Sequence, residues 1–560
     1  MSQIFFEIMA FFIVFSGLLL GVGGISHLTS PLCSLDASSI SLDPSNLPLY
    51  AFYTTLRMMV AVFLSLLFTF IYANSAAKNQ KLGQILIPLL DILQSIPVLG
   101  YIAFTVSGFL LLFPKSMLGP ELAVIFAIFT SQAWNMTFSL YQSLRTTPKE
   151  LSEAAFVFNL SPWKKFWKLE LPFAMPSLIW NTMMSMSSGW FFVVASEAIT
   201  VGHEKIFLPG IGSYIALAIQ KKDLCAVGFA IGSMLIVIFL YDQFLFRPLV
   251  AWADKFRYEA TMSQTSPQSW VLLVLQRSRF IQKFFSLLPA LKGVRFSVKQ
   301  LSVPSSSGGL HEKFISILWF SFLGIVGIGA FFYVVHFLYW EIGLGEFLKV
   351  LKLGIFTFLR VIVLVALASF LWVPIGLYIG LRPAWVQVIQ PVAQFLASFP
   401  ANLLFPVAVI LVSHYSLNPN IWLSPLIIFG AQWYILFNVI AGASVVPNDL
   451  QEVSLSLKIS DWNRWRRLLL PGIFPYFLTG AITATGGAWN ASIVAEFVSW
   501  GSQSYEAEGL GSYIAQMTQQ GNFQHIILGI GMMAFIVVVC NRFFWRPLYE
   551  RAVLNFNFDG

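Results

Sequence analysis

Two arginines and two glutamates interrupt stretches of the sequence that are otherwise apolar. Arg57 and Arg360 lie early in two such stretches, and Glu197 and Glu496 lie at the ends of two others. Ionisable groups in apolar surroundings are costly, so they tend to pair or to line a water-filled path. Arg57 has Glu197 as a candidate partner, and Arg360 has Glu496. The alternatives are that the arginines extend to a polar interface or bind an anionic solute. Asp91 is a further candidate for a lining residue.

The most distinctive pattern lies in a polar segment near residue 160. Glu153-Ala154-Ala155 is followed, after three residues, by Asn159 and, after nine more, by Leu169-Glu170-Leu171-Pro172. An acidic side chain is favoured at the start of a helix, and proline is tolerated where the next helix opens. Trp163 and Trp167, with lysines around them, have the composition of a protein-docking surface.

The same pattern recurs 299 residues later. Glu452-Val453-Ser454 is followed, at the same spacings, by Lys458 and by Leu468-Leu469-Leu470-Pro471. The acid, the spacing and the Leu-Pro pair are kept, whereas the two alanines are not. We therefore expect the second segment to be the more divergent copy of one docking element.

The elements that position these residues follow from the composition. Hydrophobic residues make up 57% of the 560-residue chain and charged residues only 10%, with a mean hydropathy of +0.76. A soluble protein of this length needs far more polar surface. These values exclude a soluble enzyme, a nucleic-acid-binding protein and a disordered chain, and they predict a polytopic membrane protein. The net charge of +8 is then explained by basic cytoplasmic loops.

Apolar runs long enough to cross a bilayer as helices occur twelve times. Six precede a polar linker at 247–312 and six follow it, so the expected units are 1–246 and 313–560. The runs lie near 4–25, 51–72, 85–112, 122–144, 173–199, 224–246, 314–339, 352–380, 388–412, 421–444, 472–499 and 526–545. The sequence thus predicts an all-α fold of twelve transmembrane helices.

The distribution of basic residues predicts the orientation. With residue 1 inside, the inside segments hold 25 of the 33 lysines and arginines. Cytoplasmic loops are enriched in these residues, so both termini are expected in the cytoplasm. The linker contains a basic, partly apolar stretch at 270–296. That stretch is either an amphipathic segment on the inner leaflet or a partly disordered linker.

The two halves are repeats of one another. The offset is 303 residues up to Pro97 and 299 from Glu153 onward. Each half has six expected helices, so both run in the same direction and form parallel repeats with a pathway at their interface. The matched segments include Leu56-Arg57 with Leu359-Arg360, Ser95-Ile96-Pro97 with Ser398-Phe399-Pro400, Trp190 with Trp489, Glu197 with Glu496, and Gly210-Ile211-Gly212 with Gly509-Leu510-Gly511.

The segment from Glu153 to Pro172 resembles the EAA loop of ABC importer permeases. That resemblance implies the type I (MetI-like) permease fold, with short helices that dock on a separate ATPase. The family's glycine is Asn159 in one loop and Lys458 in the other. Asparagine tolerates a left-handed turn better than lysine does. We therefore expect the second loop to turn differently.

Other features are similar to the nitrate, sulfonate and taurine group of these permeases. They are the Ser-x-Pro segments, the tryptophans Trp190 and Trp489 seven residues before the glutamates, and the Gly-x-Gly-x-Tyr-Ile stretches. Members usually carry one such unit and dimerise, so this chain resembles two fused units. Arg57, Asp91, Trp190, Glu197, Arg360, Trp489 and Glu496 are its candidate pathway residues.

The resemblance implies partners and a location. It implies two copies of a cytoplasmic ATPase that hold the ATP and Mg, a periplasmic or extracellular substrate-binding protein, and a bacterial inner membrane. The chain contains no P-loop sequence, no metal-binding motif and no GxSxG motif, so we expect no enzyme activity and no cofactor. A small anion such as nitrate or a sulfonate is the expected solute.

Two alternatives remain open from the sequence. One is an ion-coupled secondary transporter with two six-helix halves, in which the EAA-like loops are coincidental. The other is an ABC permease for another class of solute, such as iron or thiamine.

Overall fold

The computed structural model describes residues 40–114, 116–201, 204–256, 336–446, 448–501 and 503–556, together with Gly329 and Phe332. The chain divides into two compact units. The smaller comprises 1–17 and 273–351, and its described part holds a π-helical turn, η8 (Phe337–Ile342), and the first turns of α15 (Leu344–Gly380). The larger comprises 18–272 and 352–560. Residues 257–312 of the predicted linker, the predicted span 4–25 and most of the predicted span 314–339 lie outside the described residues. The first ten residues of that linker are described and are helical.

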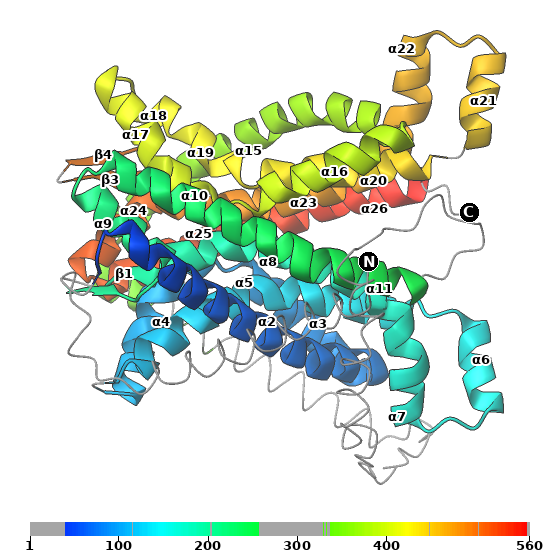
Figure 1. The fold of residues 1–560 in the computed structure, drawn as a ribbon, viewed down its shortest axis with the longest axis horizontal. Helices are drawn as coiled ribbons and strands as arrows, with labels where there is room; N and C mark the ends of the chain where they lie inside the picture. The colour runs from blue at the N-terminus through cyan, green and yellow to red at the C-terminus, as the bar shows by residue number, and fades with distance from the viewer. Residues whose placement is uncertain are drawn as a thin grey trace, which may run out of the picture. The chain divides into compact units, whose positions relative to one another are not determined.

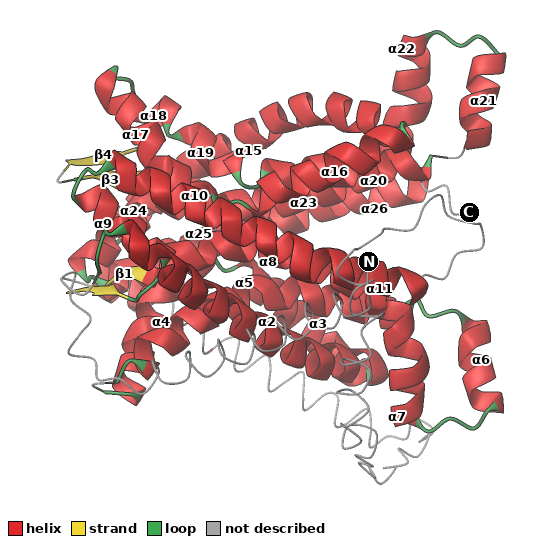
Figure 2. Ribbon diagram, viewed as in Figure 1, coloured by secondary structure: helices red, strands yellow, loops and turns green. Residues whose placement is uncertain are grey.

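The larger unit contains two series of elements in matching order, shown in Figures 1 and 2. We call residues 40–256 the first repeat and residues 352–556 the second repeat. The first repeat consists of η3 (Pro44–Asn46), α2 (Leu47–Lys78), α3 (Gln80–Ser95), α4 (Val98–Leu112), α5 (Leu118–Arg145), α6 (Lys149–Val157), α7 (Pro162–Lys165), η4 (Phe166–Glu170), α8 (Leu171–Glu197), β1 (Ala198–Val201), β2 (Glu204–Phe207), α9 (Ile211–Gln220), α10 (Leu224–Tyr241), η5 (Asp242–Phe246), α11 (Arg247–Ala253) and η6 (Asp254–Phe256).

The second repeat begins within α15. It continues with α16 (Pro383–Ser398), η9 (Ala401–Leu404), α17 (Phe405–His414), α18 (Pro419–Trp422), α19 (Ser424–Phe429), α20 (Gln432–Val445), α21 (Asn448–Ser456), α22 (Asp461–Arg464), η10 (Trp465–Leu469), α23 (Leu470–Ala495), β3 (Phe497–Trp500), β4 (Gln503–Glu506), α24 (Leu510–Gln520), α25 (Phe523–Cys540), η11 (Asn541–Trp545) and α26 (Arg546–Phe556).

Six helices in the described residues are long and apolar enough to cross a membrane. Two bent pairs raise the number to eight if each counts as one span. The predicted spans 85–112 and 173–199 form α3–α4 and α8, which are not among these eight. The number of twelve therefore stays a prediction.

The two Ser-x-Pro segments break their helices. α3 ends at Ser95 and α4 begins at Val98, while α16 ends at Ser398 and bends by 73° into η9 and α17. The sequence predicted one helix at 85–112 and one at 388–412, without a break in either. The structure corrects this, because proline lacks an N–H group and disfavours helical geometry in the residue before it. Non-helical backbone at membrane depth needs other partners. The Val98 N–H donates to the Asn490 side chain of the other repeat at 2.8 Å.

Two short antiparallel hairpins were missed by the prediction of an all-α fold. β1 pairs with β2 from Ala198↔Phe207 to Val201↔Glu204, and β3 pairs with β4 from Phe497↔Glu506 to Trp500↔Gln503. Each strand has only four residues and directly follows a long helix. The hydropathy pattern therefore does not distinguish the strands from the ends of the helices that precede them.

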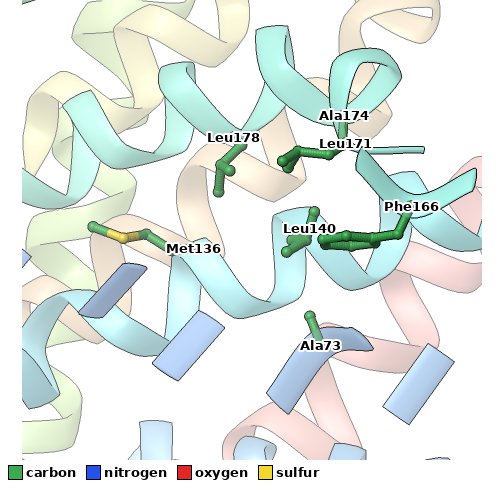
Figure 3. Close-up of a cluster of buried hydrophobic side chains, with 7 residues drawn as sticks. All are labelled: Ala73, Met136, Leu140, Phe166, Leu171, Ala174 and Leu178. Carbon is green, nitrogen blue, oxygen red and sulfur yellow. The ribbon is translucent and has the colours of Figure 1, made fainter. Parts of the chain in front are cut away.

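A buried cluster holds the first repeat together near residue 170. Ala73 of α2, Met136 and Leu140 of α5, and Ala174 and Leu178 of α8 form it with Phe166 and Leu171. Figure 3 shows Phe166 beside Leu140 and close to Leu171. The aromatic side chain thus anchors the segment that precedes α8 to the core of the repeat.

Candidate functional site

Arg57 is buried among carboxylates in the first repeat. Its Nε and Nη2 donate to the two carboxylate oxygens of Glu121 at 2.7 and 2.6 Å, and its Nη1 donates to Glu197 at 2.7 Å. Nη1 also donates to the carbonyl oxygen of Pro209 at 2.9 Å. All three ionisable side chains are at most 5% exposed. The guanidinium group is therefore committed to acceptors within the protein.

Glu197 ties three helices together. Its carboxylate accepts hydrogen bonds from the Thr54 hydroxyl of α2 and from the Gly212 N–H of α9, both at 2.7 Å. Its backbone carbonyl accepts a hydrogen bond from the Ser213 hydroxyl at 2.8 Å. A Cβ atom at Gly210 would collide with this carboxylate, which explains the need for glycine at that position. We call this arrangement the glutamate clamp.

The second repeat contains the same clamp with one carboxylate fewer. Arg360 pairs with Glu496, which also accepts hydrogen bonds from the Thr357 hydroxyl at 2.9 Å and from the Gly511 N–H at 2.8 Å. The side chain of Arg360 is 12% exposed, compared with 4% for Arg57. Within the described residues, Glu496 is the carboxylate that pairs with Arg360.

Sequence reasoning proposed the Arg–Glu pairs but missed Glu121. This residue lies at the edge of a predicted span and has no counterpart in the alignment of the repeats. The two tryptophans are core residues: Trp190 is fully buried and packs edge-on against Tyr241 at 5.6 Å between ring centroids, and Trp489 is also buried. The side chain of Asp91 lies outside the described residues.

A small cavity lies between the repeats. It has a volume of about 70 Å³ and is bounded by α8 of the first repeat and by α16, η9, α20 and α23 of the second. We call it the central cavity. The polar and aromatic residues of its lining include Ser188, Phe191, Phe192, Phe399, Tyr434 and Asn490. Because typical small-molecule sites have roughly 300–1,000 Å³, the central cavity is a narrow point in this conformation.

A larger cavity lies at the C-terminal ends of α8 and α23. It has a volume of about 670 Å³ and is lined by β1, β2, β3, β4, α9 and α24, and we call it the hairpin cavity. Its polar side chains include Gln220, Gln503, Glu506, Gln516, Gln519 and Gln520. Arg57, Glu197, Arg360 and Glu496 line neither of these two cavities.

The first EAA-like segment forms two short helices joined by a left-handed turn. Glu153 and Ala154 are exposed on α6, whereas Ala155 is buried. Asn159 has a φ of 49°. The prediction that Glu153 begins a helix is wrong, because α6 begins at Lys149 and Glu150 is the acid in its first turn.

The start of α7 and the end of this segment also differ from the expectation. α7 begins at Pro162, and its capping Ser161 accepts a hydrogen bond from the Lys164 N–H. α7, the π-helical turn η4 and α8 then follow without a break, so Pro172 does not open a separate helix. A serine-proline pair at a helix start is the signature that could have located α7 from the sequence.

The second segment has the same geometry. Glu452 is exposed on α21, Lys458 has a φ of 50°, and η10 leads directly into α23, which contains Leu470 and Pro471. The expectation that the second loop turns differently is therefore wrong. The turn is imposed by the two helices that it joins, and the lysine adopts the strained conformation.

The two segments differ in what they expose and in how they are anchored. Phe156 and Phe158 are 86% and 76% exposed at the end of α6, and Trp462 is 65% exposed on α22. Glu170 lies 3.4 Å from Lys78, an ion pair that fixes the first segment to α2. The second repeat has Leu469 at the equivalent position, which is buried instead. Both segments thus present apolar and basic side chains to solvent.

Comparison with known proteins adds a family match in each repeat. Residues 61–249 and 372–544 each match the family described as "Binding-protein-dependent transport system inner membrane component". The two matches cover more than half of the chain and include both EAA-like segments, the residues that line the two cavities, and Glu197 and Glu496 of the clamps, whereas Arg57 and Arg360 precede the matched residues.

Individual relatives are similar over one repeat's length. The bicarbonate transport system permease protein CmpB of Synechocystis sp. is 28% identical over 178 residues, which cover 32% of this chain and 60% of the relative. The nitrate import permease protein NrtB of Leptolyngbya laminosa is 27% identical over 183 residues, which cover 32% of this chain and 62% of the relative. The glycine betaine/carnitine transport permease protein GbuB of Listeria monocytogenes is 27% identical over 163 residues, which cover 29% of this chain and 52% of the relative. The chain thus spans a little over half the length of these relatives.

Proposed function

Because the chain belongs to the family of binding-protein-dependent transport system inner membrane components, we propose that it forms the whole membrane pathway of an ATP-driven importer for a small solute. It is a multi-pass membrane protein with two family domains, a fused two-unit permease. The family and the relatives are transport components and not enzymes, so ATP hydrolysis belongs to a separate subunit.

One observation carries the proposal. The two helix pairs α6–α7 and α21–α22 project at the same end of the larger unit (Figure 1) and share one backbone turn despite different sequences. Each pair continues through a π-helical turn into a helix that borders the cavities, α8 or α23. A force on the short helices would therefore be transmitted to the walls of the pathway.

This geometry supports two ATPase subunits, one docked on each helix pair. Exposed aromatic side chains flanked by lysine or arginine are suited to insertion into a cleft of a partner protein. The count of basic residues supports a cytoplasmic location for these loops and for both termini, and the family supports a bacterial inner membrane. A periplasmic binding protein would then deliver the solute at the opposite end, where the hairpins and the hairpin cavity lie.

The names of the relatives do not converge on one solute. Bicarbonate and nitrate are inorganic anions, whereas glycine betaine and carnitine are organic and carry no net charge. The expected oxyanion is therefore one candidate class. The lining of the cavities is a better guide to the solute than these names.

The coupling role is tested by Glu153→Lys and Glu452→Lys. Both residues are exposed, so each variant should keep the wild-type melting temperature. We expect Glu153→Lys to reduce co-purification of the ATPase and vanadate-sensitive uptake in proteoliposomes more than Glu452→Lys, because the first loop matches the family pattern more fully. A matched control is Glu346→Lys, which changes a partly exposed acid of α15 that pairs with Lys349 outside these loops.

Two results would contradict the proposal. Normal association with the ATPase and normal uptake in both variants would show that the loops do not couple the permease to the ATPase. Uptake that persists without the ATPase and responds only to a proton or sodium gradient would instead identify a secondary transporter.

A further inference from the structure

The hairpin cavity is asymmetric although the repeats that form it are related. The first repeat contributes mainly apolar side chains, among them Phe207 and Ile219. The second repeat contributes Glu506 at the position equivalent to Phe207, and Gln516 at the position equivalent to Leu217. One wall is therefore apolar and the facing wall carries amide and carboxylate groups.

Glutamine side chains give this wall a mixed hydrogen-bonding character. Each amide both donates and accepts hydrogen bonds, unlike an arginine or a lysine, which only donates. Gln516 donates to the Glu506 carboxylate at 2.5 Å, which fixes the two side chains against each other. A solute that only accepts hydrogen bonds, as nitrate does, would leave the carbonyl and carboxylate oxygens of this wall without partners.

The charge of the lining is negative. Glu506 is the one charged side chain among the described residues that line the hairpin cavity, and no lysine, arginine or histidine is among them. Lys222 packs beside Gly501 but does not line the cavity. The arginines that could serve an anion, Arg57 and Arg360, are held by the glutamate clamps.

We propose that the hairpin cavity is a solute vestibule for organic molecules that carry no net negative charge and that both donate and accept hydrogen bonds, with Glu506 and Gln516 as its selectivity residues. This inference rests on the proposed function, since it assigns the solute class of the same pathway. The volume of about 670 Å³ fits such a molecule. An inorganic oxyanion would fill a small part of it.

The charge preference can be measured without knowing the solute. In a background in which Cys33, Cys225 and Cys540 are replaced by alanine, Ser504→Cys places one thiol in the cavity lining. The full chain in nanodiscs is treated with a trimethylammonium-ethyl or a sulfonatoethyl methanethiosulfonate, and the two modification rates are compared. Ser416→Cys, an exposed residue that does not line the cavity, corrects for the intrinsic reactivity of the reagents.

We expect the corrected rate ratio to favour the cationic reagent by about five-fold or more, because a lone carboxylate in a concave site concentrates its field. Glu506→Gln should abolish most of that preference. The matched control Glu508→Gln removes a nearby exposed carboxylate that does not line the cavity, and it should leave the ratio unchanged.

A ratio of one or a preference for the anionic reagent would overturn the proposal, and so would equal effects of Glu506→Gln and Glu508→Gln. These results would leave the permease function intact, because ATP-dependent uptake and the Glu153→Lys experiment do not depend on them. If those assays fail but the cationic reagent is clearly preferred, the vestibule proposal is supported and the proposal of ATP coupling is contradicted.

Discussion

Arg57 and Glu197 illustrate how a charged pair at membrane depth can be structural. The guanidinium group meets two carboxylates and a carbonyl oxygen, and Glu197 receives an N–H group and a hydroxyl as well. These contacts join the end of α8 to α2, α5 and α9. The arrangement therefore accounts for the charges as a clamp that holds the segment after the first hairpin, and it leaves neither side chain facing a cavity.

The two clamps are expected to differ in how much they stabilise the fold. Arg57→Ala would leave Glu121 and Glu197 buried without a cation, and loss of one partner of a buried pair costs about 3–5 kcal/mol. Arg360→Ala leaves a single carboxylate and removes a partly exposed side chain, so we expect a smaller cost, about 1–3 kcal/mol. Thermal unfolding of the detergent-solubilised protein, followed by size-exclusion chromatography, measures both.

Two further variants act as controls. Glu121→Gln keeps the shape and the Arg57–Glu197 pair, so it should be milder than Arg57→Ala. The exchange Arg57→Glu with Glu197→Arg should not restore stability, because the Gly212 N–H that donates to the Glu197 carboxylate cannot accept a hydrogen bond from an arginine. Wild-type melting of Arg57→Ala would show that the clamp does not stabilise the fold.

At the scale of the element, the two EAA-like segments show one backbone geometry built from different sequences. Asn159 and Lys458 occupy the same left-handed turn, and both segments lead through π-helical turns into long helices. π-helical turns are uncommon and often occur at functional sites. Their repetition at equivalent positions indicates that the shape of the segment, rather than its side chains alone, is what the fold maintains.

The strained turn gives a direct prediction. Lys458→Gly should stabilise the second repeat by about 1 kcal/mol, because a left-handed conformation costs a non-glycine residue about 1–2 kcal/mol and glycine's greater freedom when unfolded offsets part of the gain. Asn159→Gly should give a smaller gain. The measurement is the melting temperature of each variant, with Lys458→Val as the contrasting change that should lower it. A loss of stability in Lys458→Gly would show that the lysine side chain supports the turn.

At the scale of the whole larger unit, the repeats are joined by a few hydrogen bonds next to the central cavity. The hydroxyl oxygens of Ser187 on α8 and Ser398 on α16 lie 2.8 Å apart, and the Asn402 side chain donates to the Phe191 carbonyl oxygen at 3.2 Å. Both contacts connect the helix that follows the first EAA-like segment to the broken helix of the other repeat. Relative motion of the repeats must therefore separate these residues.

A cross-link at this point should stop transport reversibly. In the cysteine-free background, Ser187→Cys with Ser398→Cys is expected to form a disulfide on mild oxidation. ATP-dependent uptake should then fall at least about ten-fold and recover on reduction, since alternating access needs one repeat to move against the other. Each single cysteine variant is the control. Full uptake by the oxidised double variant would show that these residues stay together during transport.

The sequence by itself determined the membrane class, the two repeats and the positions of the EAA-like segments. These features depend on local properties: the length of apolar runs and the spacing of matched residues. The pairing of each arginine with a glutamate could also be predicted from the sequence, because each repeat contains both partners.

Only the tertiary structure decided which side chains meet across helices. Glu121 joins the first clamp because α5 packs against α2, and Glu506 faces Gln516 because the second hairpin folds onto α24. It also imposed a left-handed turn on Lys458, against the residue's own preference. The physical reason is the same in each case: the closing of helices and hairpins on one another fixes neighbours and backbone angles that no local pattern encodes.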